Sequence, residues 1–147
     1  MATSTTTYLT NPTVTITPAT SGTLFDATSV TSSATLTVGY DPLESTSFGD
    51  TGHVFVKGLQ AVEVTLTCYA YYGATSVEQT LFTALGTGTS TIVISPAGAT
   101  ESASNPEYTI TNTMLSSFTP ITGSYGELSM FEVTFTGGTF ARDITAP

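Results

Sequence analysis

The only histidine, His53, is the side chain best suited to act as a general acid or base near neutral pH. It follows Asp50 by three residues, so the two side chains form a candidate acid–base pair or part of a metal site. A metal site would need carboxylates from elsewhere, because the sequence contains one cysteine and no second histidine. We therefore favour a hydrogen-bonded loop histidine, and we predict neither a metal ion nor a cofactor.

Hydroxyl groups are abundant, but their surroundings do not resemble those of a catalytic nucleophile. No serine lies in a Gly-x-Ser-x-Gly turn, and a serine nucleophile would have to use His53 as its base. Carboxylate pairs for glycoside hydrolysis are possible in principle. However, the sequence contains none of the tryptophan that sugar-binding clefts favour. We predict that the protein is not an enzyme and has no catalytic residues.

The other chemically notable side chains have simple structural interpretations. Cys68 alternates with apolar neighbours, so we expect a small core residue and not a reactive thiol. Lys57 is a candidate anion contact, but we expect this sole lysine to pair with a carboxylate of its own subunit or a neighbour. A tyrosine cluster forms either a ligand platform or, as we favour, an interface. Its members are Tyr69, Tyr71 and Tyr72.

Basic residues are nearly missing from the sequence. Lys57 and Arg142 stand against eleven carboxylates, and the formal net charge is −9. Small hydroxyls take the place of charge, since 34 threonines and 16 serines make up a third of the 147 residues. Such a surface repels phosphates and argues against a nucleic-acid-binding protein. A charged fraction of 9% is also well below the quarter or so typical of solvated surfaces, which favours a subunit covered by copies of itself.

The threonine content and the apolar pattern predict a mainly β protein. Threonine is branched at its β carbon and suits a pleated surface better than a helix. Apolar residues alternate with threonines in several segments, as they do in half-buried strands. The strands predicted in this way cover residues 13–17, 34–40, 62–71, 92–94, 108–118 and 131–135.

One short helix is predicted at about residues 76–86. Ser76 and Gln79 have the spacing of a capping box, and Gly86 suits a left-handed helix end. Four apolar residues are expected to share the buried face of this helix, namely Val77, Leu81, Ala84 and Leu85. We expect a β-sandwich or flattened barrel with the helix covering one end.

The domain organisation is expected to be simple. We predict a polar N-terminal arm at 1–12, a single β-sandwich domain at 13–140 and an extended tail at 141–147. The N-terminus lacks the basic and apolar regions of a signal peptide, and no stretch approaches the ~20 apolar residues of a membrane span. We therefore expect synthesis in a cytoplasm and no membrane insertion.

A long connection at residues 41–53 shows no useful periodicity. Structureless loops of this length are uncommon in compact domains and are often functional. Because the loop carries two large apolar side chains, we expect it to leave its own domain and contact an adjacent subunit. The residues assigned to this inter-subunit loop are Leu43, Phe48, Gly49, Asp50 and His53.

Three segments, in this order, resemble the major tail tube proteins of long-tailed, siphovirus-like bacteriophages of actinobacteria. The first contains Phe48-Gly49-Asp50 within residues 40–53 and continues through Gly58-Leu59 to the strand at 62–71. The second is the helix followed by Gly86 and the strand at Ile92. The third contains Asn105-Pro106-Glu107-Tyr108 and the turn Gly123-Ser124-Tyr125-Gly126-Glu127-Leu128. The resemblance spans residues 38–136, and none of its motifs is catalytic.

The resemblance implies a structural virion protein whose β-sandwiches close into hexameric rings. In that family the rings stack into a tube through which DNA passes, so the implied partners are further copies, other tail proteins and unspecifically contacted DNA. The implied location is the tail of the virion. Related folds occur in head-decoration and head-to-tail joining proteins, and a capsid decoration or adhesive module remains the alternative.

Strand parity selects the residues expected to line such a tube. On the strand at 62–71, one set of alternate residues is apolar and belongs to the core. The opposite set is polar, and the strand at 131–135 shows the same division. If the two strands are near neighbours, their polar residues share one face. The residues predicted to face the lumen are Glu63, Thr65, Thr67, Glu132 and Thr134.

Overall fold

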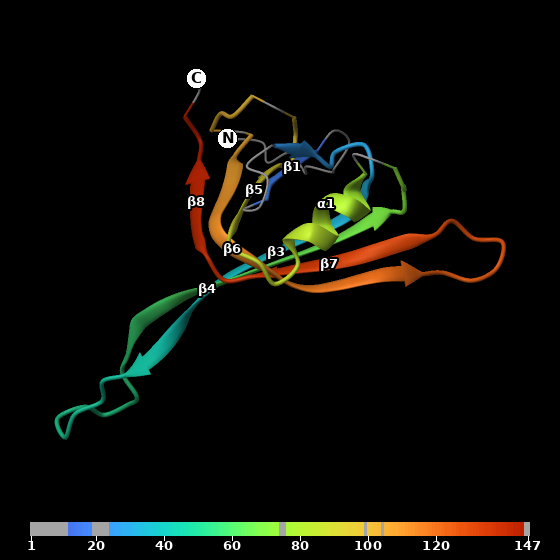
Figure 1. The fold of residues 1–147 in the computed structure, drawn as a ribbon. Coiled ribbons are helices and arrows are strands. Elements are labelled where there is room, and N and C mark those ends of the chain that lie inside the picture. Colours follow the sequence, from blue (N-terminus) through green and yellow to red (C-terminus); the bar gives the residue numbers. More distant parts are fainter. Residues whose placement is uncertain (1–11, 19–23, 74–75, 99, 104, 146–147) are drawn as a thin grey trace.

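The computed structural model describes residues 12–18, 24–73, 76–98, 100–103 and 105–145 of the chain. It confirms the predicted mainly β fold with one short helix (Figure 1). The helix α1 comprises Val77–Ala84 and lies between β4 and β5. The strands are β1 (Thr13–Thr17), β2 (Phe25–Asp26), β3 (Thr31–Glu44), β4 (Phe55–Tyr69), β5 (Ser90–Ser95), β6 (Glu107–Thr122), β7 (Met130–Thr136) and β8 (Thr139–Asp143).

All the described strands join one open antiparallel sheet in the order β2-β1-β5-β6-β7-β4-β3, with β8 paired to β6. Strand β6 takes part in two layers. Its first half pairs with β5 and β8, and its second half pairs with β7. We call β2, β1, β5, the first half of β6 and β8 the short-strand layer. The second half of β6 together with β7, β4 and β3 is called the four-stranded layer. The sandwich is thus one sheet folded over at β6 (Figure 1).

The fold-over occurs at a backbone position that few side chains accept. Asn112 has φ 58° and is the only described residue other than glycine with a positive φ. Asparagine enters this left-handed region more readily than most residues. Opposite it, a Cβ on Gly138 would lie 2.4 Å from the Thr111 carbonyl oxygen, at φ +96°. Close backbone approach at this point therefore requires the glycine.

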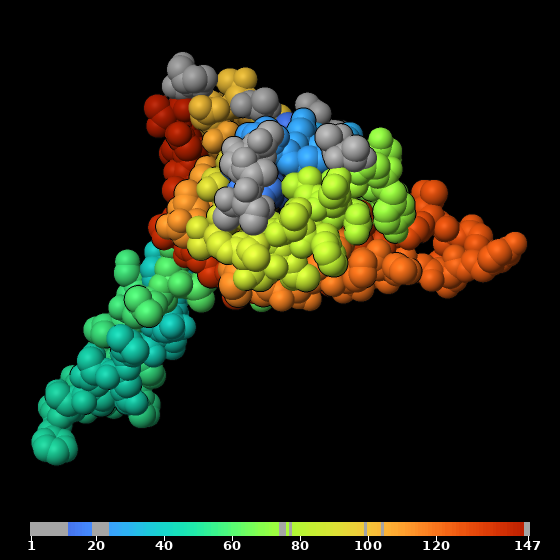
Figure 2. Space-filling model, viewed as in Figure 1, coloured from blue at the N-terminus to red at the C-terminus, as the bar shows by residue number. Residues whose placement is uncertain are grey.

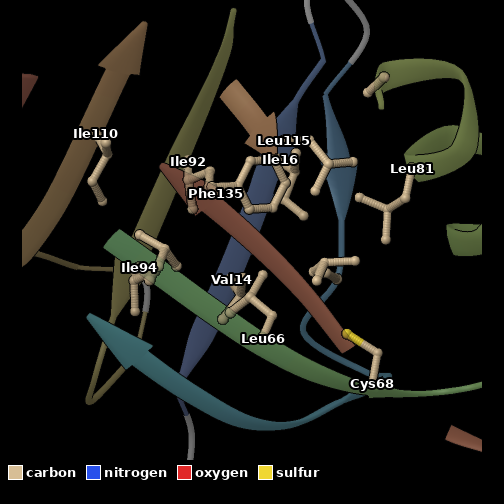
Figure 3. Packing of buried hydrophobic residues seen from close by; sticks show 14 of the residues in the cluster. Val14, Ile16, Leu66, Cys68, Leu81, Ile92, Ile94, Ile110, Leu115 and Phe135 are labelled. Atoms are coloured by element: carbon tan, nitrogen blue, oxygen red, sulfur yellow. The ribbon is translucent and has the colours of Figure 1, made fainter. Parts of the chain in front are cut away.

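The core lies between the two layers and follows the predicted alternation. Val14 and Ile16 of β1 face Leu66 of β4 and Phe135 of β7 across the interior (Figure 3). Leu81 of α1 enters the same cluster from the side. Every second residue from Val62 to Cys68 is buried, as is every second residue from Phe131 to Phe135. Layer stacking is therefore driven by apolar faces that the sequence encodes with a period of two.

Helix α1 begins and ends where the sequence predicts. The Ser76 hydroxyl accepts a hydrogen bond from the Gln79 N–H (3.3 Å), and Gly86 adopts φ +69° just beyond the helix. Leu81 and Ala84 are buried as expected, but Leu85 remains 37% exposed. Leu85 is the C-cap with extended ψ, so it leaves the buried face. None of the described helices is long and apolar enough to cross a membrane.

The predicted loop at 41–53 is wrong in its bounds, because the structure has a shorter loop between two longer strands. Strand β3 continues to Glu44 and β4 begins at Phe55, so only residues 45–54 connect them. Together, residues 41–58 form a hairpin that projects from the body, which we call the hairpin arm (Figure 2). Neither face of this ribbon is covered, so its strands carry no alternating apolar pattern for sequence reasoning to detect.

The C-terminal boundary of the predicted domain lies further along the chain in the structure. Residues 141–143, which we expected in an extended tail, form the end of β8 and pair with β6. Strand β8 is anchored because Phe140 packs against the core and stacks on Tyr108, with ring centroids 5.7 Å apart. The predicted N-terminal arm lies outside the described residues apart from Pro12.

Candidate functional site

Strands β4 and β7 are direct neighbours, so the condition for a shared polar face is met. Thr65 pairs with Thr134 and Thr67 pairs with Glu132, while Glu63 lies opposite Thr136. Directly opposed residues in a ladder point to the same side of a sheet. The five residues predicted for the lumen therefore lie together on the side of the four-stranded layer that faces away from the core.

This side of the layer extends across all four of its strands, and we call it the polar face. Beyond β4, Thr35 of β3 pairs with Thr65; beyond β7, Ser117 of β6 pairs with Thr134. Neighbouring hydroxyls bond one another at its edge, where Ser116 Oγ lies 2.8 Å from Thr136 Oγ1. The residues assigned to the polar face are Ser33, Thr35, Thr37, Glu63, Thr65, Thr67, Ser117, Thr119, Glu132, Thr134 and Thr136.

The polar face is weakly acidic and rich in hydroxyl groups. Its assigned residues include two carboxylates and no basic group. Glu132 pairs with Thr67, so Glu63 and Glu132 are offset by four residues, or about 13 Å along the strand direction. That separation exceeds the reach of the carboxylate pairs in glycosidases. The two groups therefore contribute negative potential and not paired acid–base chemistry.

The hairpin arm holds all five residues that we assigned to an inter-subunit loop. Leu43, Phe48, Gly49, Asp50 and His53 are each exposed, and the Phe48 ring is in contact with solvent on all sides. Several other apolar side chains on the arm are also at least 40% exposed. They are Val54, Phe55 and Val56, and just beyond the arm Leu59 is also exposed. An apolar ribbon this exposed is typical of a surface that is buried by a partner.

Polar side chains fix the tip of the arm. His53 pairs with Glu44 and not with Asp50: its Nδ1 donates to the Glu44 carboxylate over 2.7 Å, and Thr46 Oγ1 donates to the same oxygen. These two hydrogen bonds lower the pKa of Glu44 below its ordinary value. Asp50 instead accepts from the Ser47 N–H and hydroxyl, which lower the pKa of Asp50. His53 is thus a hydrogen-bonded loop histidine, the interpretation that we favoured.

Lys57 contacts a ring and not a carboxylate of its own chain. Its Nζ lies 4.5 Å from the centroid of the Tyr40 ring, a cation–π geometry at the base of the arm. Among the described residues the His53–Glu44 contact is the only ion pair, so the expected pairing of Lys57 within its own subunit is wrong. Tyr40 is additionally held by Gln60, whose Nε2 donates to the Tyr40 hydroxyl (3.3 Å).

Cys68 and the tyrosines lie at opposite extremes of exposure. Cys68 is buried in the core, as predicted, and this burial raises the pKa of its thiol. Tyr69, Tyr71 and Tyr72 are substantially exposed at and beyond the end of β4. Within the described part of the chain, no group of three or more His, Cys, Asp and Glu side chains is arranged to hold a metal ion.

Sequence reasoning missed a second apolar tip at the β6–β7 turn. Ile121, Tyr125 and Leu128 are largely or fully exposed there, on a hairpin that projects from the body away from the arm (Figures 1 and 2). The signal was available, because apolar residues flank and interrupt the Gly123–Gly126 turn. The projecting hairpin was not predicted, because Pro120 suggested that the strand ends before it, whereas β6 continues past Pro120 to Thr122.

No protein-family model matches the chain, and no curated protein matches its sequence. Solved structures do match over nearly the whole length. The tail of an empty gene transfer agent particle, refined with C6 symmetry, has a TM-score of 0.68 at 12% identity and covers 96% of this chain and 100% of that one. The SPP1 tail tube has a TM-score of 0.68 at 10% identity and covers 93% of this chain and 78% of that one.

A third similar structure is the tube-terminating cap of the anti-feeding prophage. Its TM-score is 0.71 at 16% identity, with 99% of this chain and 95% of that chain covered. At identities this low the likenesses establish the fold, which this chain shares with tail tube components of phage-like particles.

Proposed function

We propose that this protein is a structural tail tube protein whose copies close into hexameric rings that stack into a conduit for DNA. The observation that carries the proposal is the four-stranded layer, which has a core face, a polar face and an unpaired strand at each edge. The likeness to the SPP1 tail tube and to the C6-symmetric gene transfer agent tail supports it. The sequence resemblance supports the finer assignment to a siphovirus-like phage of actinobacteria.

Ring closure is supported by the two edges of the four-stranded layer. In the described chain, β3 pairs only with β4, and the second half of β6 pairs only with β7. Unpaired strand edges template pairing with another chain. Joining β3 of one copy to β6 of the next continues the layer head to tail, and a head-to-tail contact that closes on itself generates a ring.

The polar face lines the lumen in this arrangement. Glu63, Thr65, Thr67, Glu132 and Thr134 then form acidic, hydroxyl-rich belts on the inner wall. Carboxylates repel phosphates, and hydroxyls give the duplex no cationic contact. DNA therefore passes without being bound, in keeping with a net charge of −9.

The hairpin arm contacts an adjacent subunit, most simply in the neighbouring ring because it projects beyond the body. Leu43 and Phe48 supply the apolar contact. Gly49, Asp50 and His53 shape the tip that presents them. The protein would be made in the host cytoplasm and act in the virion tail, as a partner of itself and of other tail proteins, without membrane insertion or enzymatic activity.

A tube terminator or head-to-tail joining protein is a second candidate. It is favoured by the likeness to the anti-feeding prophage cap and to the sheath/tube terminator of an extracellular contractile injection system, which has a TM-score of 0.70 at 15% identity. The two roles predict different assemblies, because a terminator forms one ring layer whereas a tube protein stacks without limit.

Electron microscopy and light scattering of the concentrated purified protein test the proposal. We expect six-fold rings that stack into tubes of variable length. Rings that never stack would favour the terminator. A chain that stays monomeric at every concentration, also in the presence of a tail-initiating complex, would contradict both roles.

Substitution of Glu63 and Glu132 by lysine tests the lumen assignment. Tubes of the double variant should form but impede DNA passage, because each ring would then hold phosphates. Thr37→Lys and Thr119→Lys on the same face should act in the same direction. Unimpaired DNA ejection through lysine-lined tubes would place the polar face on the outer wall.

A further inference from the structure

A groove of about 710 Å³, lined by apolar side chains and at one side by Thr28, Thr31 and Ser32, opens beside β3 between the two layers. Its floor and walls include Leu36 and Val38 of β3, Val14 of β1, Ile94 of β5 and Phe140 of β8. Leu36 is only partly buried and Val38 is 36% exposed, although both point to the core side of their strand. At this edge the sandwich is thus incomplete among the described residues.

At the opposite edge of the four-stranded layer the gap between the layers is closed by α1. Leu81 and Ala84 plug the core there, and the Gly86 N–H donates to the Leu115 carbonyl of β6 (3.2 Å). Helix α1 packs against β6, which forms this edge of the layer. The outward side of the helix exposes Phe82 by 65% and Leu85 by 37%.

We infer that α1 of one copy docks into the groove of the next copy, with Phe82 as its anchor. This contact rests on the proposed ring and specifies how its subunits join. When β3 of one copy continues into β6 of the next, the core sides of the two edges become adjacent. The helix beside β6 is then brought to the groove beside β3, and an exposed aromatic side chain meets a site that the described residues leave unfilled.

Charge supports the same pairing. Tyr108 lines the groove and is the ladder partner of Arg142, which shares a face of β8 with the groove residue Phe140. Arg142 forms no ion pair within the described chain. On α1, Glu78 precedes Phe82 by four residues and so lies on the same side of the helix. Docking places an acidic group of the helix against the one arginine of the sequence.

A complementation experiment tests the contact. Phe82→Glu removes the helix anchor but leaves the groove, and Val38→Glu blocks the groove but leaves the helix. Each variant alone should fail to form rings, with association weakened by roughly ten-fold or more. An equimolar mixture should give 1:1 dimers by native mass spectrometry, because one intact contact remains. Ser124→Glu, which adds the same charge at an exposed position on the β6–β7 turn, is the matched control and should assemble normally.

The charge pair offers a milder test. Arg142→Glu should weaken ring formation, and adding Glu78→Arg in the same chain should restore it. The double variant also regains the wild-type net charge, so the matched control combines Arg142→Glu with Glu127→Arg on the β6–β7 turn, which should not restore ring formation. Failure of the double variant to recover would count against the assigned orientation of the helix.

Cross-linking measures proximity without disrupting the interface. A photoreactive residue at position 38 should link to residues 78–85 of another copy in assembled rings. A link to residues 1–11 of the same chain would overturn the proposal, as would normal incorporation of Phe82→Glu into rings. A wild-type chain that forms no ring would instead contradict the proposed function itself, so the two failures are distinguishable.

Discussion

Strands β3 and β4 each contain a segment folded into the body and a segment that leaves it. In the body, Val64 and Leu66 of β4 are fully buried, and their neighbours Thr65 and Thr67 face outward. In the hairpin arm, the same two strands expose both sides of the ribbon. Backbone pairing alone continues across the boundary, and apolar burial stops there. The body therefore depends on its own core, whereas the arm has apolar residues that only another molecule can cover.

Truncating a core side chain should give the largest difference in stability effect between the body and the hairpin arm. Phe131 is fully buried and packs edge-on against Phe118, with ring centroids 5.6 Å apart. Phe131→Ala should lower the free energy of unfolding by about 3–5 kcal/mol through lost burial and a residual cavity. Denaturant unfolding of the monomer measures the loss. A change below about 1 kcal/mol would show that the body does not depend on this core.

Two glycines provide a matched comparison of backbone constraint. An alanine Cβ at Gly138 would meet the Thr111 carbonyl oxygen at 2.4 Å, and at Gly58 it would meet the Asp41 carbonyl oxygen at 2.6 Å. Gly138→Ala should destabilise the body by roughly 1–3 kcal/mol, because its φ of +96° is also strained for alanine. Gly58→Ala should distort the arm without lowering the melting temperature of the body. Equal melting losses would contradict the independence of the arm.

Phe48→Ala should have the reverse signature of the core variant. The side chain is exposed in the monomer, so the free energy of unfolding should change by less than about 0.5 kcal/mol. The free energy of association should weaken by about 1.5–3 kcal/mol per contact if the Phe48 side chain is buried between copies. Sedimentation and thermal melting on the same samples measure both quantities. Unfolding of the variant monomer would place Phe48 in the core and refute the assignment.

The smallest effect is expected from pH, and only in the arm. Hydrogen bonds from His53 and Thr46 lower the pKa of Glu44, so their contribution is present above its ordinary value of 4.5 and is lost as pH falls through the lowered pKa. The side-chain carboxyl resonance of Glu44, followed by NMR, should therefore titrate with a midpoint below 4.5. In His53→Ala that transition should shift to higher pH. An unchanged midpoint would remove His53 as the main cause.

The sequence predicts those parts of the fold in which each residue has one consistent environment. The alternation of Val62, Val64 and Leu66 identified a half-buried strand, and Ser76 with Gln79 identified the start of α1. Parity then placed Glu63 and Glu132 on one side of the layer. That β4 and β7 are neighbours could not be derived, because ladder partners distant in sequence leave no local pattern.

The candidate site was predictable to a similar degree. The apolar loop was recognised by Phe48, but its strands were missed because a ribbon exposed on both sides lacks periodicity. The expected carboxylate partner of Lys57 within its own chain was wrong, since nothing in the sequence brings Tyr40 beside it; only the β3–β4 register does. A carboxylate partner in a neighbouring subunit stays a prediction. The groove at Val38 could not be predicted from the sequence. It depends on how far the strands of the two layers cover one another, which no local pattern encodes.

The double membership of β6 has a consequence for the order of events during synthesis. Its partners β5 and β7 lie on either side of it in the sequence, and β7 ends at Thr136. As the chain leaves the ribosome, β3 and β4 emerge early with the arm already able to pair as a hairpin, but the rest of their layer does not yet exist. Residues are added at about 5–20 per second, so several seconds separate the arm from its finished scaffold. In the proposed ring, a nascent chain would lack the second edge until β6 and β7 have emerged, so the strand order would disfavour premature polymerisation on the polysome.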